Sequence, residues 1–386
     1  MIYRVLALKY RPSIFEEVVG QKYIITALIN SLKFKMLHHA YLFIGTRGVG
    51  KTTISRILAK ALNCKKNKNN NIITTFPCNL CKTCIAINKD RLIDYIEIDA
   101  ASNRGIENMT SLLNQAIYIP SFAKYKIYMI DEVHMLTIYA FNSMLKILEN
   151  PPKHVKFILA TTEPQKIPLT ILSRCLQFHL KKISIKDIIK HIKYILKKEK
   201  IEFEESALLF LSKNSYGSMR DALSLVDQAI YFSKKKITLK IVQNMLGSLN
   251  NFYLIELLYA LLIKNKKKIF SIISIINKFC ISYDIVLQNF SSLIYTINLV
   301  QITSYINFEF LQYKKEIFFL ASKFSKEEIH FFYQIVIHGR EELSLAPDEQ
   351  IGFSMILLRM LIFYPYTLNN IKNIFLKEFN FFKKNI

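Results

Sequence analysis

The chain has 386 residues, 51% of them hydrophobic, which is enough for two or three domains with sizeable cores. The N-terminus lacks the pattern of a signal peptide, and apolar stretches such as Phe252–Ile263 are too short and too interrupted for membrane spans, so we expect a cytoplasmic protein. The 53 basic and 29 acidic residues give a net charge of +24, which fits a polyanionic partner and fits an AT-rich coding bias equally well, because the lysines are spread along the chain.

The first elements are a short arm and a helix. Leu6–Pro12 alternates apolar and basic residues, and its length and Pro12 argue against a helix. We expect an extended arm that either lies against a neighbouring site or forms a surface turn. Tyr23–Met36 has the apolar spacing of a helix.

Residues 40–62 have the pattern of a strand, a glycine-rich loop and a helix. The loop Gly45–Thr52 fits the motif G-x-x-x-x-G-K-[ST]. In such a loop backbone N–H groups surround an anion, the lysine binds the β- and γ-phosphates, and the hydroxyl ligates Mg²⁺. The flanking strand Ala40–Ile44 and the helix after the loop are the context this motif requires, so the sequence predicts a nucleoside triphosphate site. Its candidate residues are Gly45, Thr46, Arg47, Gly48, Val49, Gly50, Lys51, Thr52 and Thr53.

Four cysteines follow the loop's helix with the spacing C-x₁₃-C-x₂-C-x₂-C, namely Cys64, Cys78, Cys81 and Cys84. Four thiolates suit a tetrahedral Zn²⁺, and a complete ligand set indicates a structural site. An Fe–S cluster, disulfides or free core thiols are the alternatives. Cys175 and Cys280 stand alone and are expected to be inert.

Two further apolar strands end in polar residues. Lys126–Glu132 is a buried strand that ends in Asp131 and Glu132. Downstream of a phosphate loop, the first acid orients Mg²⁺ and the second polarises the attacking water. The strand Val155–Ala160 leads to Thr162, whose hydroxyl could sense the γ-phosphate or could simply end a strand.

Alternation of strands and helices over residues 1–180 predicts a three-layer α/β domain with a parallel sheet, in which a module over about 64–90 is inserted. A helix is expected over Ile106–Ile117. From residue 181 the β pattern fades, and residues 181–246 predict a small helical domain. In that domain Arg220 follows a Gly-Ser helix start and could reach a phosphate, or could be solvated. Residues 247–365 read as all-helical, and 366–386 form a basic tail without an assigned role.

These segments, in this order, resemble the gamma/tau subunits of bacterial DNA polymerase III, which are AAA+ clamp-loader ATPases. The resemblance spans nearly the whole chain. It is carried by HHAYLFIGTRGVGKT (His38–Thr52), the four cysteines, IEIDAAS (Ile96–Ser102), IDEVHML (Ile130–Leu136) and GSMRDALSLVDQAI (Gly217–Ile230), with Leu6–Pro12, Val155–Pro168, Leu172–Leu180 and Gly339–Pro347.

The resemblance implies a role for each matching residue. The phosphate loop, Asp131 and Glu132 would bind and hydrolyse ATP with Mg²⁺, with Thr162 as first sensor and Arg220 as second sensor. Arg174 resembles an arginine finger supplied to the ATP of a neighbouring subunit. Residues 181–246 would be the lid and 247–365 the collar, and the cysteines would hold zinc. The adenine pocket would be flanked by Ala7, Lys9, Tyr10, Arg11 and Pro12.

The implied partners are delta, delta-prime and further gamma/tau copies in a five-subunit ring, together with the sliding clamp and primed DNA. ATP binding and hydrolysis would open the clamp and load it. The chain has no polymerase palm and is not expected to polymerise nucleotides, so a nucleotidyltransferase label would belong to the holoenzyme. Its end soon after the collar resembles the short, gamma-like form, and the Lys/Asn-rich loop after Cys64 is longer than the family leads us to expect.

Two alternative functions stay open. One is another AAA+ machine on DNA, such as a branch-migration motor, but such proteins generally lack the four cysteines. The other is a non-hydrolysing subunit of the same ring, against which the intact Lys51, Asp131, Glu132 and Arg220 argue.

Overall fold

The computed structural model describes residues 5–65, 74–102, 113, 115–233, 236–246, 251–278, 282–303, 305–306, 310 and 313–363. Most of the helix predicted over Ile106–Ile117, Cys280 and the tail 366–386 lie outside these residues. The chain divides into two compact units, Met1–Val242 and Gln243–Ile386. Each unit is described by itself.

The first unit contains a five-stranded sheet in the order β2-β3-β4-β1-β5, in which every neighbouring pair is parallel. This confirms the predicted parallel α/β fold. The strands predicted at Ala40–Ile44, Lys126–Glu132 and Val155–Ala160 are present as β1, β3 and β4. The strands are β1 (Ala40–Ile44), β2 (Tyr95–Asp99), β3 (Lys126–Asp131), β4 (Val155–Thr161) and β5 (Leu176–His179).

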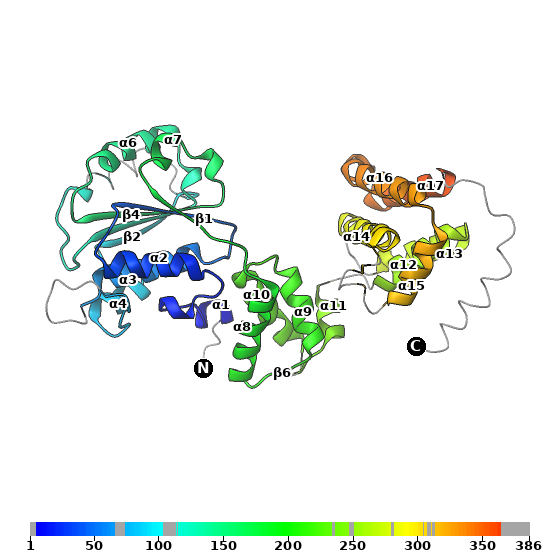
Figure 1. Cartoon of the computed structure of the whole chain (residues 1–386), viewed down its shortest axis with the longest axis horizontal. Helices are drawn as coiled ribbons and strands as arrows, with labels where there is room; N and C mark the ends of the chain where they lie inside the picture. Colours follow the sequence, from blue (N-terminus) through cyan, green and yellow to red (C-terminus); the bar gives the residue numbers. More distant parts are fainter. Residues whose placement is uncertain are drawn as a thin grey trace. The chain divides into compact units, whose positions relative to one another are not determined.

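Helices cover both faces of the sheet (Figure 1). One face carries α2 (Lys22–Lys33), α3 (Lys51–Asn63) and α4 (Lys82–Asn88), and the other carries α6 (Ile138–Glu149) and α7 (Leu169–Leu172). Successive residues of a strand point to opposite faces, so β3 contributes to two cores. Ile127 and Met129 pack in the core under α2 and α3, and Tyr128 and Ile130 pack in the core under α6. Short 3₁₀ turns lie at Phe15–Glu17, Val133–Met135 and Pro164–Lys166.

The expectation of an extended arm before Pro12 is wrong, because Leu6–Lys9 forms a one-turn helix, α1. Leu6 is buried, and its backbone N–H donates to Asp227 Oδ2 at 2.8 Å. A carboxylate that accepts an N–H at the start of a turn stabilises that turn. The partner lies 221 residues away, so no local pattern could reveal it.

The rest of the first unit is helical, as predicted, with one addition. Its helices are α8 (Ile185–Lys198), α9 (Glu205–Asn214) and α10 (Met219–Phe232), followed by α11 (Leu239–Met245), in which the division between the two units falls. The addition is a parallel pair of two-residue strands, β6 (Glu202–Phe203) and β7 (Lys236–Ile237). Two residues are too few to show the period of a strand.

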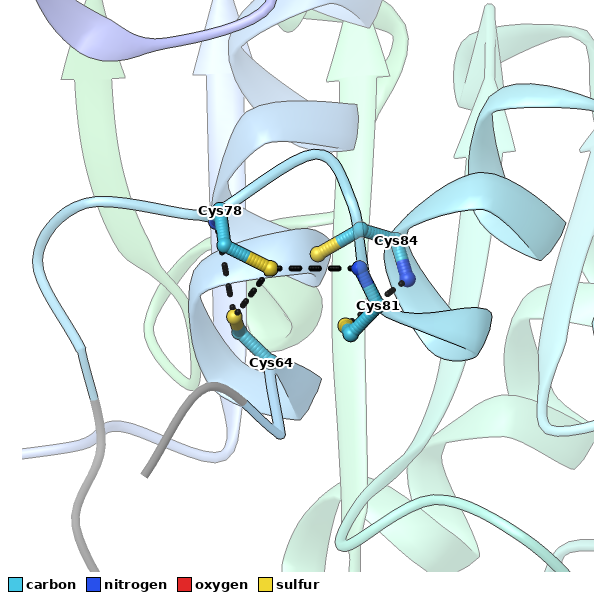
Figure 2. A group of neighbouring side chains, drawn as sticks. All are labelled: Cys64, Cys78, Cys81 and Cys84. Carbon is cyan, nitrogen blue, oxygen red and sulfur yellow. Dashed lines mark hydrogen bonds between the residues drawn. The ribbon is translucent and has the colours of Figure 1, made fainter. Parts of the chain in front are cut away.

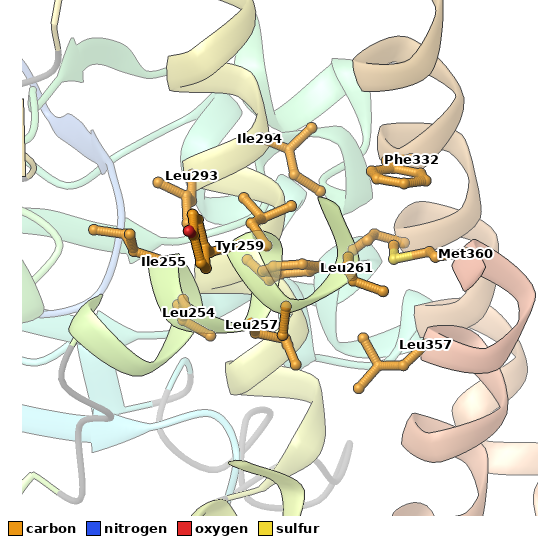
Figure 3. Packing of buried hydrophobic residues seen from close by; sticks show 14 of the residues in the cluster. Leu254, Ile255, Leu257, Tyr259, Leu261, Leu293, Ile294, Phe332, Leu357 and Met360 are labelled. Atoms are coloured by element: carbon orange, nitrogen blue, oxygen red, sulfur yellow. The ribbon is translucent and has the colours of Figure 1, made fainter. Parts of the chain in front are cut away.

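The second unit is all-helical in its described part, as predicted. A shared apolar core joins residues of α12, α14, α16 and α17, among them Leu257, Ile294, Phe332 and Met360 (Figure 3). The helices are α12 (Asn251–Leu262), α13 (Lys266–Lys278), α14 (Tyr283–Thr303), α15 (Lys314–Lys323), α16 (Lys326–Glu342) and α17 (Glu349–Phe363), with a 3₁₀ turn at Leu343–Leu345.

Within the described residues, α14 is the one helix whose length and hydropathy would allow it to cross a membrane. Its residues Leu287, Phe290, Leu293 and Ile297 are fully buried in the core of the second unit. The packing of α14 therefore accounts for its apolar composition.

A buried carboxylate holds the segment that leads into β3. Asp94 is 1% exposed and accepts the backbone N–H groups of Ser121 at 2.9 Å, Phe122 at 2.7 Å and Ala123 at 2.7 Å. Each buried donor that loses its acceptor destabilises a fold by about 1–3 kcal/mol. The three bonds make Asp94 a structural residue of this loop.

We predict that Asp94→Ala lowers the free energy of unfolding by about 3 kcal/mol or more, because three N–H groups lose their acceptor at about 1 kcal/mol or more each. Urea unfolding followed by circular dichroism measures the change. Asp94→Asn, which keeps one acceptor oxygen, should lose less. An alanine variant within about 0.5 kcal/mol of the parent, the ordinary range of surface changes, would contradict this account.

Candidate functional site

The phosphate-loop motif joins β1 to α3 in a tight turn. Gly48 (φ +77°) and Gly50 (φ +106°) have left-handed backbones that glycine adopts without strain. Lys51 begins α3 and is 6% exposed, and its Nζ donates to the carbonyls of Gly45 at 2.9 Å and Thr46 at 3.4 Å. Burial lowers the pKa of Lys51, while the carboxylates of Glu132 and Asp131 oppose that shift. The loop therefore surrounds a partly desolvated ammonium group.

Asp131 lies at the carboxyl end of β3 and reaches the loop's hydroxyl. Its Oδ2 accepts a hydrogen bond from Thr52 Oγ1 at 2.7 Å, and its Oδ1 accepts the Glu132 N–H at 3.0 Å. The hydroxyl and the carboxylate are both oxygen ligands of the kind that Mg²⁺ prefers. The two predicted metal-binding side chains therefore lie in direct contact.

Glu132 has an unusual backbone, and its carboxylate contacts Thr162 and Lys51. Its φ of 48° is a left-handed conformation that costs a non-glycine residue roughly 1–2 kcal/mol. Its Oε2 accepts the Thr162 N–H at 3.2 Å and the Thr162 hydroxyl at 3.0 Å, and its Oε1 lies 3.7 Å from Lys51 Nζ. Thr162 thus contacts Glu132 directly through both its N–H and its hydroxyl.

The helical part of the first unit contacts the phosphate loop directly. The Met219 N–H, at the start of α10, donates to the Gly48 carbonyl at 3.2 Å. A Cβ at Gly48 would lie 1.9 Å from Ser218 Oγ, so only glycine allows this approach. Ser218 caps α10 by accepting the Asp221 N–H at 3.2 Å. Arg220, in the first turn of α10, is thereby held beside the loop.

A cavity of about 860 Å³ lies between these elements. Apolar walls from Val18, Val19 and Ile183 complete it. Of the residues predicted for nucleotide binding and catalysis, those that line it are Ala7, Tyr10, Arg11, Pro12, Arg47, Gly48, Val49, Gly50, Lys51, Thr52, Thr53, Asp131, Glu132 and Arg220. The other predicted residues Lys9, Gly45, Thr46 and Thr162 do not line the described part of the cavity.

The arm that carries α1 bridges the cavity and the helical part. The Glu199 carboxylate accepts hydrogen bonds from Lys9 Nζ at 2.6 Å and from the Tyr10 hydroxyl. Burial, followed by the contact with Glu199, raises the pKa of Tyr10 to about 12. Arg11 Nε donates to Thr53 Oγ1 at 3.4 Å. The arm is therefore fixed to both sides of the cavity.

The structure does not bring Arg174 to this cavity. It follows α7 and is partly exposed, and its guanidinium donates to the Thr170 carbonyl at 2.8 Å and to Glu149 Oε1 at 2.8 Å. To reach the cavity of its own chain, the Arg174 guanidinium would have to break its ion pair with Glu149.

The four cysteines converge, as predicted (Figure 2). Their Sγ atoms all lie within 4.8 Å of one another, with 3.5 Å between those of Cys64 and Cys78. Tetrahedral zinc with Zn–S bonds of about 2.3 Å requires sulfur atoms about 3.8 Å apart. Although burial opposes it, backbone N–H bonds from Leu80 and Cys81 lower the pKa of Cys78 to about 6. Burial raises the pKa of the Cys84 thiol, so the lowered pKa of Cys78 does not extend to Cys84. The positions of the four sulfur atoms fit a zinc ion.

Sequence reasoning missed several residues around these sites. Lys60 of α3 is 2% exposed, and its Nζ donates to the Ser13 carbonyl and to Asn79 Oδ1, both at 2.8 Å. It joins the cysteine module to the arm before Phe15, and no motif marks it. Asp99 and Glu97 of β2 line the cavity. The rule that parallel strands end at one edge could have identified Asp99, which lies opposite Asp131.

The parallel sheet, the phosphate loop and the paired acids at the ends of its strands define a protein of the P-loop nucleotide-binding class. Three family models match the chain. They describe the DNA polymerase III delta subunit (residues 20–184), the ATPase lid domain of the DNA polymerase III clamp loader subunit (187–235) and domain III of DNA polymerase III subunits gamma and tau (237–371).

The chain belongs to the DNA polymerase III gamma/tau family. It is 46% identical over 95% of its length to "DNA polymerase III subunit tau/gamma" of Haemophilus influenzae, and 43% identical over 95% to "DNA polymerase III subunit tau" of Escherichia coli. It spans about half of these relatives, 52% and 56% of their lengths. It spans 97% of "DNA polymerase III subunit gamma" of Buchnera aphidicola subsp. Baizongia pistaciae, at 43% identity over 93% of this chain.

Solved structures resemble the chain more weakly. The Thermotoga maritima RuvB branch migration motor matches with a TM-score of 0.46 at 19% identity, over 66% of this chain and 80% of its own. The Bacillus subtilis clamp loader delta protein matches with a TM-score of 0.38 at 14% identity, over 88% and 99%. These scores are too low to carry an argument about function.

Proposed function

We propose that this chain is an ATP-hydrolysing subunit of the clamp loader of a bacterial DNA polymerase III holoenzyme. ATP binding and hydrolysis would open the sliding clamp and load it on primed DNA. The observation that carries the proposal is one cavity that Lys51, Thr52, Asp131 and Glu132 share with Arg220 of the helical part. Membership of the gamma/tau family supports the same function.

The contacts support a role for each side chain. Lys51 and the N–H groups of the loop would bind the β- and γ-phosphates, and Thr52 and Asp131 would hold Mg²⁺, which supplies charge neutralisation at the phosphates. Glu132, beside Lys51 and bonded to Thr162, would orient the attacking water. Thr162 would report the γ-phosphate through that bond, and Arg220 would contact ATP from α10.

The arm residues around α1 support an adenine pocket. Ala7, Tyr10, Arg11 and Pro12 line the cavity with the apolar Val18 and Val19, and Lys9 is tied to Glu199 beside it. An apolar slot next to a phosphate loop suits a purine base. The binding of the base would then fix the arm and, through Glu199, the helical part.

Arg174 is proposed to act on the ATP of a neighbouring subunit. Arg174 does not line the cavity of its own chain and is partly exposed, which supports a role in an assembly. Such a finger accelerates hydrolysis by about 10³–10⁵. We propose an assembly of five subunits that includes delta, delta-prime and further gamma/tau copies and that works in the cytoplasm. In this proposal 1–180 is the ATPase domain, 181–246 the lid and 247–365 the collar.

The cysteine cluster is proposed to bind a structural zinc ion. Cys64, Cys78, Cys81 and Cys84 supply four sulfur ligands, which leave no open position for chemistry. The role of the ion would be to hold the module of about residues 64–90 on α3.

Removal of the ammonium group at position 51 tests the nucleotide site. Lys51→Ala should weaken ATP binding by about 100-fold or more, because a charge-assisted contact to phosphate is lost. Fluorescence titration with labelled ATP measures the affinity. Glu132→Gln is the matched control and should bind ATP while hydrolysis is lost. Unchanged ATP affinity in Lys51→Ala would refute the site.

Metal analysis tests the cysteine cluster. Emission spectrometry of the purified chain should find about one zinc per chain, since four thiolates share one ion. Cys81→Ser should lose the metal, whereas Cys175→Ser, outside the cluster, should keep it. A parent chain without metal, or a Cys81→Ser chain with its full complement, would contradict the proposal.

The clamp-loading function is tested by ATPase rates of the reconstituted ring with and without clamp and primed DNA. We expect stimulation by both, and Arg174→Ala should reduce the stimulated rate by about 10³-fold at unchanged ATP affinity. Arg91→Ala, which removes another exposed arginine, is the control. An ATPase that ignores clamp and primed DNA would overturn the function, and a fully stimulated Arg174→Ala ring would overturn only the finger.

A further inference from the structure

His134 is a buried polar side chain two residues after Glu132. It lies in the 3₁₀ turn Val133–Met135, and its side chain is 5% exposed. Its Nδ1 lies 3.0 Å from Thr161 Oγ1 and 3.5 Å from Glu132 Oε2. Its Nε2 lies 3.5 Å from Glu163 Oε1. The ring is therefore in contact with groups on both of its nitrogen atoms.

The position of the ring is fixed by groups that do not belong to the phosphate loop. Thr161 is fully buried at the end of β4, and its hydroxyl accepts the Glu163 N–H at 3.0 Å. The same hydroxyl lies 3.0 Å from His134 Nδ1, and the other ring nitrogen, Nε2, faces Glu163. Glu163 is itself held by Lys166, whose Nζ lies 2.8 Å from its other oxygen. Strand β4 and Glu163 thus determine where the imidazole lies.

The fixed ring limits where Glu132 can go. His134 and both donors of Thr162 approach the same oxygen of Glu132, Oε2. The other oxygen, Oε1, lies on the side of Lys51, and Lys51 lines the cavity. A carboxylate with one oxygen held in this way presents the other in a defined direction.

We propose that His134 is a positioning residue for Glu132. Its ring restricts the movement of Glu132 Oε2, so that Oε1 faces the site where water would attack. Its contact with Thr161 links Glu132 to β4. The inference rests on the proposed ATPase function. It adds a residue whose effect is on turnover rather than on the binding of ATP.

The test compares His134→Phe with His134→Asn in the assembled ATPase. Phenylalanine keeps the ring and removes both nitrogen atoms, whereas asparagine retains a polar atom near the position of Nδ1. Because a misplacement of about 1 Å can reduce a rate by about 10²-fold, His134→Phe should lower kcat by roughly 10–100-fold with the Kd for ATP within about twofold. His134→Asn should recover a large part of that loss. His134→Gln, whose amide lies nearer the position of Nε2, should recover less.

Several outcomes would overturn the inference. Parental kcat in His134→Phe would do so, as would an asparagine variant no better than phenylalanine. A Kd for ATP that weakens in parallel with kcat would show a structural role instead. Glu132→Gln separates this failure from failure of the proposed function. If Glu132→Gln is inactive and His134→Phe is fully active, only the role of His134 is wrong; if Glu132→Gln is fully active, the ATPase assignment fails as well.

Discussion

The parallel hydrogen bonding of β1, β3 and β4 determines where the polar groups of the site lie. In a parallel sheet all the strands end at the same edge, where the loops that follow them meet. The pairing even continues past the strands, since the Gly45 N–H donates to the Thr161 carbonyl at 3.1 Å and the Ala100 N–H to the Asp131 carbonyl at 3.0 Å. A shift of register by one residue would turn Asp131 to the other face of the sheet and separate it from Thr52.

The helical part of the first unit depends on a second constraint, the close approach of two backbones at Gly48. The N–H of Met219 would otherwise be an unsatisfied donor at the start of α10, and the carbonyl of Gly48 supplies its acceptor. Any side chain at position 48 would collide with Ser218. The contact couples the conformation of the phosphate loop to the position of α10 and Arg220. Movement of α10 relative to the loop therefore requires that this hydrogen bond break.

Local sequence patterns were sufficient to predict an element where its apolar periodicity and a motif agreed. Strands β1 and β3, the helix α3 and the convergence of the cysteines could all be predicted, because apolar runs and fixed spacings carry them. The helix α1 could not, because the acceptor that stabilises it, Asp227, is distant in sequence. The left-handed backbone of Glu132 and the contact between His134 and Thr161 were also hidden. Both arise from the way β3 and β4 end side by side, which is tertiary information.

The phosphate loop and the cysteine cluster looked like independent motifs, but they lie at the two ends of one helix. Lys51 is the first residue of α3, and Cys64 is the residue that follows its last turn. Lys60, on the same helix, binds the carbonyl of Ser13 and the side chain of Asn79 in the cysteine module. A metal at the cysteines would therefore fix the carboxyl end of the helix whose amino end would carry the phosphates. On this view the cysteine module stabilises the nucleotide site at a distance of about 20 Å, the length of a 13-residue helix, and needs no chemistry of its own.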